Sequence, residues 1–445
     1  MLVPGHMPPR PSRGWKPLVL AAFRGPAALL LAATLLAVQL LTALLLTVLP
    51  LTALLLPVPL LAADAPAAKA ERTVHVGYLG IPGGAPLGFL APDGGQDLAT
   101  LGWGTGNYSA LDAVRMAVVD LNAQGRYYGM KFDLEARTAE DAAGVRKALQ
   151  GLQRAGVRYV VADLSDALMR VASEGVDASM LLFNVAATGD DLRNEHCAAR
   201  VFHVIPSRAM LADALAQYLV KRNWRRWLIV TGPLERDREF LQALQRAGQR
   251  YGAQIADTRT WESNADIRRS AQAEFPLFTA KADYDVVVVS DETAQFGQFL
   301  AYHTYLPRPL AGTQSLVPTA WFWAHEQWGA TQLNHRFMRA TKRKMTSSDW
   351  AAWIATTAVG EALMRGKAGD PAAVAAYLVR DDTSLEGYKG VSMNFRPWDR
   401  QLRQPVLLVT PEATVSASPQ DGYLHPKNIL DTLGYDEPES RCRSR

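Results

Sequence analysis

The six residues Asp285–Ser290 read DVVVVS, an unbroken run of β-branched residues between two polar ones. An apolar run of this length without alternating polar positions is typical of a strand buried on both faces of a parallel sheet. The neighbouring segments alternate between strand and helix patterns: strands at Trp227–Thr231 and Leu310–Thr313, and helices at Glu235–Tyr251 and Gln295–Tyr305. We therefore predict that residues 206–330 form a parallel sheet covered by helices on both faces.

The same alternation occupies residues 72–205. Strands are predicted at Thr73–Leu79, Lys131–Ala136, Arg158–Ala162 and Met180–Val185, and helices at Ser109–Gln124 and Ala139–Ala155. After this unit, Ser207 is placed as the N-cap of a further helix. Two such units in tandem predict a two-lobed α/β protein whose ligand cleft lies between the lobes, outside the carboxyl ends of the strands. Such a cleft closes around its ligand by hinge motion.

The remainder of the chain is expected to complete both lobes. Helices are predicted at Thr331–Met345, Asp349–Met364 and Pro371–Val379, and strands near Val391–Phe395 and Val406–Thr410. We expect residues 331–386 to finish the first lobe and 387–410 to finish the second. The tail, 411–445, is rich in Pro, Asp and Gly and is expected to wrap the surface.

Residues 1–63 have the pattern of an export signal. Four basic residues precede an uncharged, Leu- and Ala-rich run over Gly25–Ala63, and Ala62, Ala63 and Ala65 are small enough for a signal peptidase. The run exceeds the usual signal core of roughly 7–15 residues, and also the roughly 20 residues of a membrane helix. We predict a cleaved signal peptide, with an uncleaved anchor near Ala27–Leu49 as the alternative.

The charge balance argues against nucleic-acid binding. The four basic residues before the apolar run account for the net charge of +4, and the other 43 basic residues match the 43 acidic ones in number. A protein that binds nucleic acid needs a basic patch to contact phosphates, and a neutral body predicts none.

The chain has two cysteines, Cys197 and Cys442. Two cysteines exclude a four-cysteine metal site, and their spacing excludes a CxxC redox pair. In an oxidising compartment an even pair predicts one disulfide, which would join the C-terminal tail to the first half of the chain. The alternative is two unpaired thiols.

Four segments resemble a known family. They are LDAVRMAVVDLNAQG (Leu111–Gly125), VVADLSDAL (Val160–Leu168), LLFNVAATGDDLR (Leu181–Arg193) and YDVVVVSDETAQFGQFL (Tyr284–Leu300). Over residues 72–400 the chain is similar to type I periplasmic binding proteins of ABC transporters, in the leucine-binding-protein-like branch that binds branched-chain amino acids. The resemblance implies a periplasmic protein without enzymatic activity or cofactor, which hands a small ligand to an ABC transporter permease.

The C-terminal segments resemble a narrower group. NFRPWDRQLRQPVLL (Asn394–Leu408), SPQDGYLHPKNILDTLG (Ser418–Gly434) and DEPESRC (Asp436–Cys442) look like binding proteins associated with pyrroloquinoline-quinone (PQQ)-dependent alcohol dehydrogenase systems. This resemblance implies a role beside periplasmic alcohol oxidation and does not identify the ligand. The alternative is a membrane-retained sensor or scaffold with the same fold.

In the first lobe the resemblance implies a site for an anionic or polar ligand. Ser165 and Thr188 fall where the family holds the ligand carboxylate, with backbone donors from Ala186 and Ala187. Hydroxyl and amide groups at a strand-to-helix turn suit an anion.

In the second lobe the family pattern is not kept. The family's aromatic positions fall on the region of Arg236 and on Asp291 and Glu292, and the acid that holds the ligand ammonium is replaced by Gln314. A buried ammonium needs a charged or well-bonded partner, so the loss of this acid disfavours an α-amino ligand. Asp291 or Glu292 could compensate.

Other candidates have two interpretations each. Trp103 and Tyr108 follow the first strand, where they could stack on a ligand or pack their own loop. Trp321, Trp323 and Trp328 cluster near the crossover between lobes, either as a binding surface or as hinge packing.

The chain has no GxSxG, HExxH or P-loop motif and no EF-hand spacing, so neither catalysis nor a metal site is predicted.

Overall fold

The computed structural model describes residues 72–84, 109–262 and 267–442. The predicted export signal or anchor, and the candidate ligand residues Trp103 and Tyr108, lie outside the described residues. Within the described ranges, no helix combines the length and apolar character needed to cross a membrane.

The first sheet has five parallel strands in the order β2-β1-β3-β4-β5. Their bounds are β1 Arg72–Gly80, β2 Met130–Thr138, β3 Tyr159–Asp163, β4 Leu181–Asn184 and β5 Val201–His203. Side chains of β3 alternate between two apolar clusters, with Tyr159 and Val161 in one and Val160 and Ala162 in the other. Both faces of this sheet are therefore buried, as the apolar strand patterns predicted.

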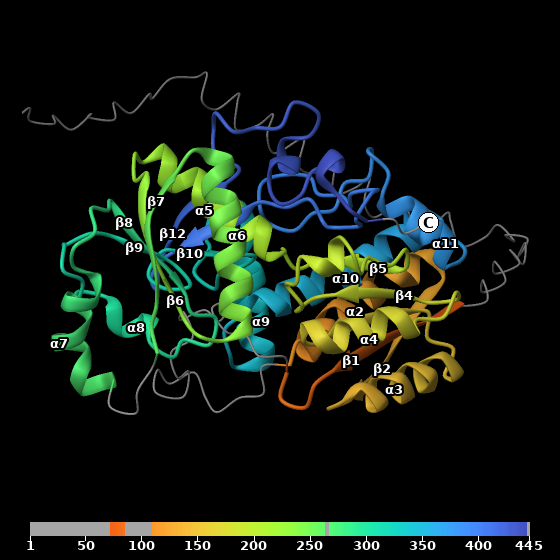
Figure 1. Cartoon of the computed structure of the whole chain (residues 1–445). Coiled ribbons are helices and arrows are strands. Elements are labelled where there is room, and N and C mark those ends of the chain that lie inside the picture. Colours follow the sequence, from red (N-terminus) through yellow and green to blue (C-terminus); the bar gives the residue numbers. More distant parts are fainter. Residues whose placement is uncertain (1–71, 85–108, 263–266, 443–445) are drawn as a thin grey trace, which may run out of the picture. The chain divides into compact units, whose positions relative to one another are not determined.

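Helices cover both faces of the first sheet, and together they form the first lobe (Figure 1). The helices are α2 Leu111–Gly125 and α10 Ser347–Met364 on one face, and α3 Ala142–Arg154 and α4 Asp166–Gly175 on the other, with α11 Pro371–Leu378 beyond α10. A Cβ at Gly360 of α10 would lie 2.2 Å from Leu121 of α2, so glycine is needed for this close helix contact. Ser165 caps α4 by accepting from the N–H of Leu168.

The second sheet has four parallel strands in the order β7-β6-β8-β9 and forms, with its helices, the second lobe. The strands are β6 Arg226–Thr231, β7 Gln254–Thr260, β8 Val286–Ser290 and β9 Leu310–Gly312. The helices are α5 Arg208–Lys221 and α6 Glu235–Tyr251 on one face, and α7 Ile267–Thr279 and α8 Gly297–Leu300 on the other. The predicted strand in Asp285–Ser290 is confirmed, and its four valines are fully buried.

A third sheet connects the C-terminal part of the chain to α5. It is antiparallel, in the order β10-β11-β12, with β10 Val317–Thr319, β11 Val406–Val409 and β12 Thr414–Ser418. Ser418 Oγ donates to the backbone oxygen of Ala214 in α5 at 2.8 Å. The tail therefore begins with a strand, although the sequence predicted only an irregular segment along the surface.

The remaining elements are α9 Ala330–Thr341 and the 3₁₀ turns η2 Arg126–Tyr128, η3 Asp191–Arg193, η4 Gln327–Gly329, η5 Ile429–Thr432 and η6 Glu437–Glu439.

Three predicted elements differ from the structure. The helix predicted over Gln295–Tyr305 is only the four residues of α8, because Ala301 takes a ψ of 126° and Tyr302 a φ of +66°, and a right-handed helix excludes both. The helix predicted to reach Met345 ends at Thr341, where Lys342 takes a φ of +63°. No strand forms at 391–395. Met393 and Phe395 make only single bridges to Leu385 and Leu402, and the N–H of Phe395 donates to Leu378.

Gln401 and Leu402, which we expected in the second lobe, lie against the first sheet. The N–H of Leu402 donates to the backbone oxygen of His203 in β5, and the side chain of Gln401 donates to the same oxygen. The C-terminal part of the chain is thus shared between the lobes.

Candidate functional site

A buried arginine lies where the loops after β3 and β8 meet the start of α5. Arg208 is the first residue of α5 and its side chain is 3% exposed. Its guanidinium binds Glu292 with two hydrogen bonds of 2.6 and 2.8 Å, Asp166 at 2.8 Å and Glu239 at 3.0 Å. We call these four residues the Arg208 cluster. Because Asp166 begins α4 of the first lobe while Glu239 and Glu292 belong to the second, the cluster links the two lobes.

The Arg208 cluster has three carboxylates for one guanidinium. Burial alone would lower the pKa of Arg208, but Glu292 and Asp166 outweigh it and hold the pKa well above its usual range. Burial raises the pKa of Asp166, and Arg208 reverses this and holds that pKa low. Burial raises the pKa of Glu239. Arg208 opposes this rise, but the neighbouring acids Asp166 and Glu292 add to it, and the pKa stays above its usual value. The excess negative charge suits a partner that donates hydrogen bonds better than it suits a second anion.

The predicted first-lobe residues lie beside this cluster. Thr188 is buried, and its backbone oxygen accepts from the N–H of Arg208 at 3.0 Å. Ser165 precedes Asp166 and caps α4. The N–H groups of Ala186 and Ala187 both donate to Asn184 Oδ1, at 3.3 and 2.9 Å. The two backbone donors expected to face a ligand are therefore engaged by a side chain of the protein.

The predicted second-lobe residues take different positions. Glu292 belongs to the Arg208 cluster. The carboxylate of Asp291 accepts from the N–H groups of Gln295, Phe296 and Gly297, so it orders the turn that leads into α8. Gln314 is buried, and its Cγ would lie 2.6 Å from a Cβ on Gly297. Arg236 lies half-buried in the first turn of α6.

Arg208 and Glu239 were not among the site residues predicted from the sequence. One signal was available: Arg208 stands in the first turn of a helix whose first five residues are otherwise apolar (RAMLA). A cation at this position opposes the helix dipole and is disfavoured unless acidic partners lie nearby. An arginine at the start of an apolar helix therefore predicts buried acidic partners, although not their identity.

Asp237 supports the loop that carries Glu292. It is 1% exposed, and its carboxylate accepts from the N–H of Glu292 at 2.8 Å and from that of Leu234 at 3.2 Å. Burial, with added repulsion from Asp291 and Glu292, raises the pKa of Asp237 to about 6. Its carboxyl is therefore half-protonated in the folded protein at a pH where a free aspartate is fully ionised.

We expect Asp237 to make the folded protein less stable as pH rises from about 4 to 6. Its pKa is higher in the folded state (about 6) than in the unfolded state, so ionisation in this interval favours unfolding. Replacing Asp237 with Asn removes this dependence. The difference in unfolding free energy between wild type and variant should change by about 1–3 kcal/mol between pH 4 and 7, in favour of wild type at the lower pH. Urea unfolding at each pH measures it, and parallel profiles for both proteins would contradict the assignment.

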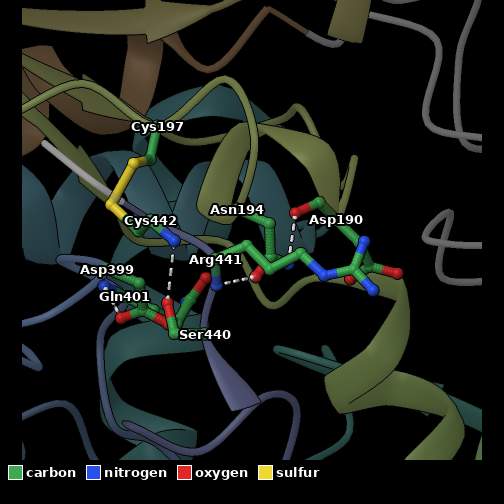
Figure 2. Close-up of a disulfide and its surroundings, with 8 residues drawn as sticks. All are labelled: Asp190, Asn194, Cys197, Asp399, Gln401, Ser440, Arg441 and Cys442. Atoms are coloured by element: carbon green, nitrogen blue, oxygen red, sulfur yellow. Dashed lines mark hydrogen bonds between the residues drawn. A yellow bond between two sulfur atoms is a disulfide. The ribbon is translucent and has the colours of Figure 1, made fainter. Parts of the chain in front are cut away.

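The C-terminal tail is joined to the first lobe beyond β4. Cys197 and Cys442 form a disulfide with their Cα atoms 5.5 Å apart, which confirms the predicted pairing. Figure 2 shows the adjacent contact, in which the N–H of Arg441 donates to Asn194 Oδ1 at 3.1 Å. In the second lobe, Asp213 of α5 accepts from the N–H of Gly434 at 2.8 Å. The tail is thus fixed to both lobes.

Several solved structures similar to this chain are described as solute-binding proteins of ABC transporters. A branched-chain amino acid ABC transporter periplasmic ligand-binding protein from Burkholderia xenovorans matches with a TM-score of 0.65 at 16% identity, over 83% of this chain and 99% of that one. The leucine-, isoleucine-, valine-, threonine- and alanine-binding protein of Brucella ovis, in its closed conformation, matches at 0.61 and 16%, over 78% and 93%. A solute-binding protein from R. palustris in complex with benzoate matches at 0.57 and 12%, over 84% and 100%.

No curated protein sequence matches the chain. A family model described as periplasmic binding protein matches residues 86–415, which is most of the chain. The solved structures are too distant in sequence to give more than the fold, and that fold agrees with the family model. The two parallel sheets, the helices on both faces of each and the family match lead to one conclusion: the chain belongs to the periplasmic binding protein family.

Proposed function

We propose that this protein is the exported solute-binding component of an ABC transporter. It binds one small polar solute between its lobes, closes around it and presents it to a permease. The main support is the Arg208 cluster, which joins Asp166 of the first lobe to Glu239 and Glu292 of the second, beyond the carboxyl ends of β3 and β8. Ligands of open α/β sheets bind at this edge, and similar solved structures carry ABC transporter functions in their names.

The ligand we propose is a polar molecule with N–H or O–H groups. The sequence left open an anionic or a polar ligand. Two contacts favour the second: Arg208 already has three carboxylate partners, and Asn184 engages the N–H groups of Ala186 and Ala187. An anion would have to displace one of these carboxylates from Arg208 and would face repulsion from the others. A ligand donor can instead bind Glu239, which is the most exposed of the three at 34%.

The proposed setting is periplasmic alcohol oxidation. Its support is the resemblance of segments within 394–442 to proteins of PQQ-dependent alcohol dehydrogenase systems, with residues 1–63 as the export signal. A sensor or scaffold retained at the membrane is the second candidate. The tail favours it, because contacts with Asn194 in one lobe and Asp213 in the other oppose large lobe rotations. Mass spectrometry of the exported protein's N-terminus separates a cleaved transport receptor from an anchored protein.

A ligand screen combined with one substitution tests the site. Thermal shift against alcohols, aldehydes, amino acids, carboxylates and the quinone cofactor should find a polar solute that stabilises the protein. Replacing Thr188 with Val keeps the side-chain volume and removes the hydroxyl. We expect calorimetry to give about tenfold weaker binding of that solute, as for one lost hydrogen bond to a ligand.

The matched control is Thr356→Val. Thr356 is also buried, but its hydroxyl donates to the backbone oxygen of Ala352 within α10, away from the cluster. The Thr356→Val variant should bind the solute with the affinity of wild type. Unchanged affinity in Thr188→Val would remove Thr188 from the site, and tight binding of carboxylates alone would contradict the ligand class.

A further inference from the structure

A cavity of about 610 Å³ lies in the first lobe, apart from the Arg208 cluster. Its wall is formed by the second half of α10 from Trp353, by Arg365 directly after this helix, by the loop 384–392, by Trp328 of η4 and by Gln124 at the end of α2. Helix α2 runs back from the carboxyl end of β1 to the start of β2, so Gln124 near its end lies at the amino-terminal edge of the strands. Asp166 follows β3 and lies at the carboxyl-terminal edge, so the cavity and the Arg208 cluster are at opposite edges of the first sheet. The volume is within the range of small-molecule sites.

Three aromatic rings line this cavity: Trp328, Trp353 and Tyr388. The rings of Trp353 and Tyr388 are 5.7 Å apart between centroids and tilted by 37°. Trp328 is 64% exposed although it is a large apolar side chain. Trp353 is 6% exposed and Tyr388 is half-buried, so Trp328 presents the most open π face to whatever enters the cavity, with the Tyr388 ring beside it.

The backbone holds two of these rings in place. Trp328 and Tyr388 have φ values of +59° and +58°, which non-glycine residues rarely adopt. Each ring covers a glycine of the other segment: a Cβ on Gly390 would lie 2.4 Å from the Trp328 indole, and one on Gly329 would lie 3.2 Å from the Tyr388 ring. Strained conformations of this kind persist where the surrounding structure fixes them, commonly at ligand sites.

The charged side chains that line the cavity have an excess of one carboxylate. Arg365 pairs with Glu361 at 3.2 Å. Glu386 accepts from Ser384 Oγ at 3.3 Å, and no ion pair among the described residues includes it. The neighbouring cation, Lys389, is buried instead, with its ammonium donating to Gln404 and Pro405. The lining is therefore aromatic and net negative.

We propose that this cavity binds a small organic ammonium ion. Aromatic faces attract a cation through the ring quadrupole, and an alkylated ammonium loses little hydration on entering such a site. Glu386 supplies the counter-charge, and the rings of Trp328 and Tyr388 supply the faces. The site is independent of the solute proposed for the Arg208 cluster.

Calorimetric titration with choline chloride at low ionic strength tests the proposal. Choline should bind with a saturable isotherm, about tenfold more tightly than its uncharged carbon isostere dimethylbutanol. Trp328→Leu and Tyr388→Leu should each weaken choline binding about tenfold, and Glu386→Gln should weaken it several-fold.

Tyr302→Leu is the matched control, because Tyr302 is also an exposed aromatic with a φ of +66° but lies in the second lobe. It should leave choline binding unchanged. All variants should remain folded at the temperature of the titration, which a melting curve of each one checks. Equal affinity for choline and dimethylbutanol would overturn the ammonium assignment. The site would be overturned if choline binding did not saturate, or if both leucine variants bound choline as tightly as wild type. Either result is independent of the solute that the Arg208 cluster binds.

Discussion

Replacing Arg208 with Met lowers the free energy of unfolding by about 3–5 kcal/mol at neutral pH. The substitution keeps most of the side-chain volume and removes the guanidinium that binds Glu292, Asp166 and Glu239. Glu292 is 6% exposed, so its carboxylate would remain buried without its cation. An uncompensated buried charge costs far more than the net contribution of the pair. Urea unfolding followed by tryptophan fluorescence measures the change.

Two further variants separate this effect from a general loss of charge. Arg238→Met, in α6, removes an arginine whose pair with Glu235 is 53% and 74% exposed, so it should cost less than about 1 kcal/mol. Adding Glu292→Gln to Arg208→Met should recover part of the loss, because it removes the unpaired carboxylate. Similar small costs for Arg208→Met and Arg238→Met would show that the Arg208 cluster does not hold the lobes together.

The strand and helix pattern was predictable because it depends on local chemistry. The valines of β8 and the capping serine Ser207 form periodic or positional signals that the chain carries in itself. The helix over Gln295–Tyr305 was wrong for a reason outside that pattern. Asp291 binds three consecutive N–H groups there, and Tyr302 adopts a left-handed conformation that its own sequence neighbourhood does not encode.

The sequence indicated only some residues of the candidate site. Ser165 and Thr188 fell beside the Arg208 cluster because the strand-to-helix loops of this fold converge at one edge of each sheet. The pairs of Arg208 with Asp166 and Glu292 join residues 42 and 84 positions apart, and no spacing rule connects them. The capture of two backbone donors by Asn184 likewise depends on the fold of one loop, which residue types do not reveal.

Besides the pairing of β12 with β11 and the ion pair of Asp431 with Arg403, two contacts hold the last part of the C-terminal tail. Near its end, the disulfide of Cys197 with Cys442 joins it to the first lobe. Nearer its start, Asp213 binds Gly434 and forms ion pairs with Arg246 and Arg250 of α6, and these arginines also bind the backbone oxygen of Gly434. The disulfide acts mainly on the unfolded chain, whereas the Asp213 contacts exist only in the folded one.

Replacing both Cys197 and Cys442 with Ser should lower the free energy of unfolding by up to about 5 kcal/mol. The two cysteines are 245 residues apart in sequence, and a crosslink over so long a loop removes much of the entropy of the unfolded chain. Calorimetric melting of the variant, beside wild type with and without a reductant, measures the loss. Wild type treated with the reductant should have the same melting temperature as the variant.

Hydrogen exchange tells which part of the tail the disulfide holds. In the double serine variant, Gly434 should remain protected because Asp213 still accepts from its N–H, while Arg441 should exchange faster because its bond to Asn194 loses the neighbouring crosslink. Asp213→Asn should have the opposite effect: the Gly434 amide should exchange faster, while the Arg441 amide should keep its protection. The contradicting outcome is a serine variant with the melting temperature of wild type and the same exchange rate at the Arg441 amide. That result would show that the disulfide neither lowers the entropy of the unfolded chain nor holds the tail. Loss of protection along the whole tail would mean that the Asp213 contacts depend on the disulfide.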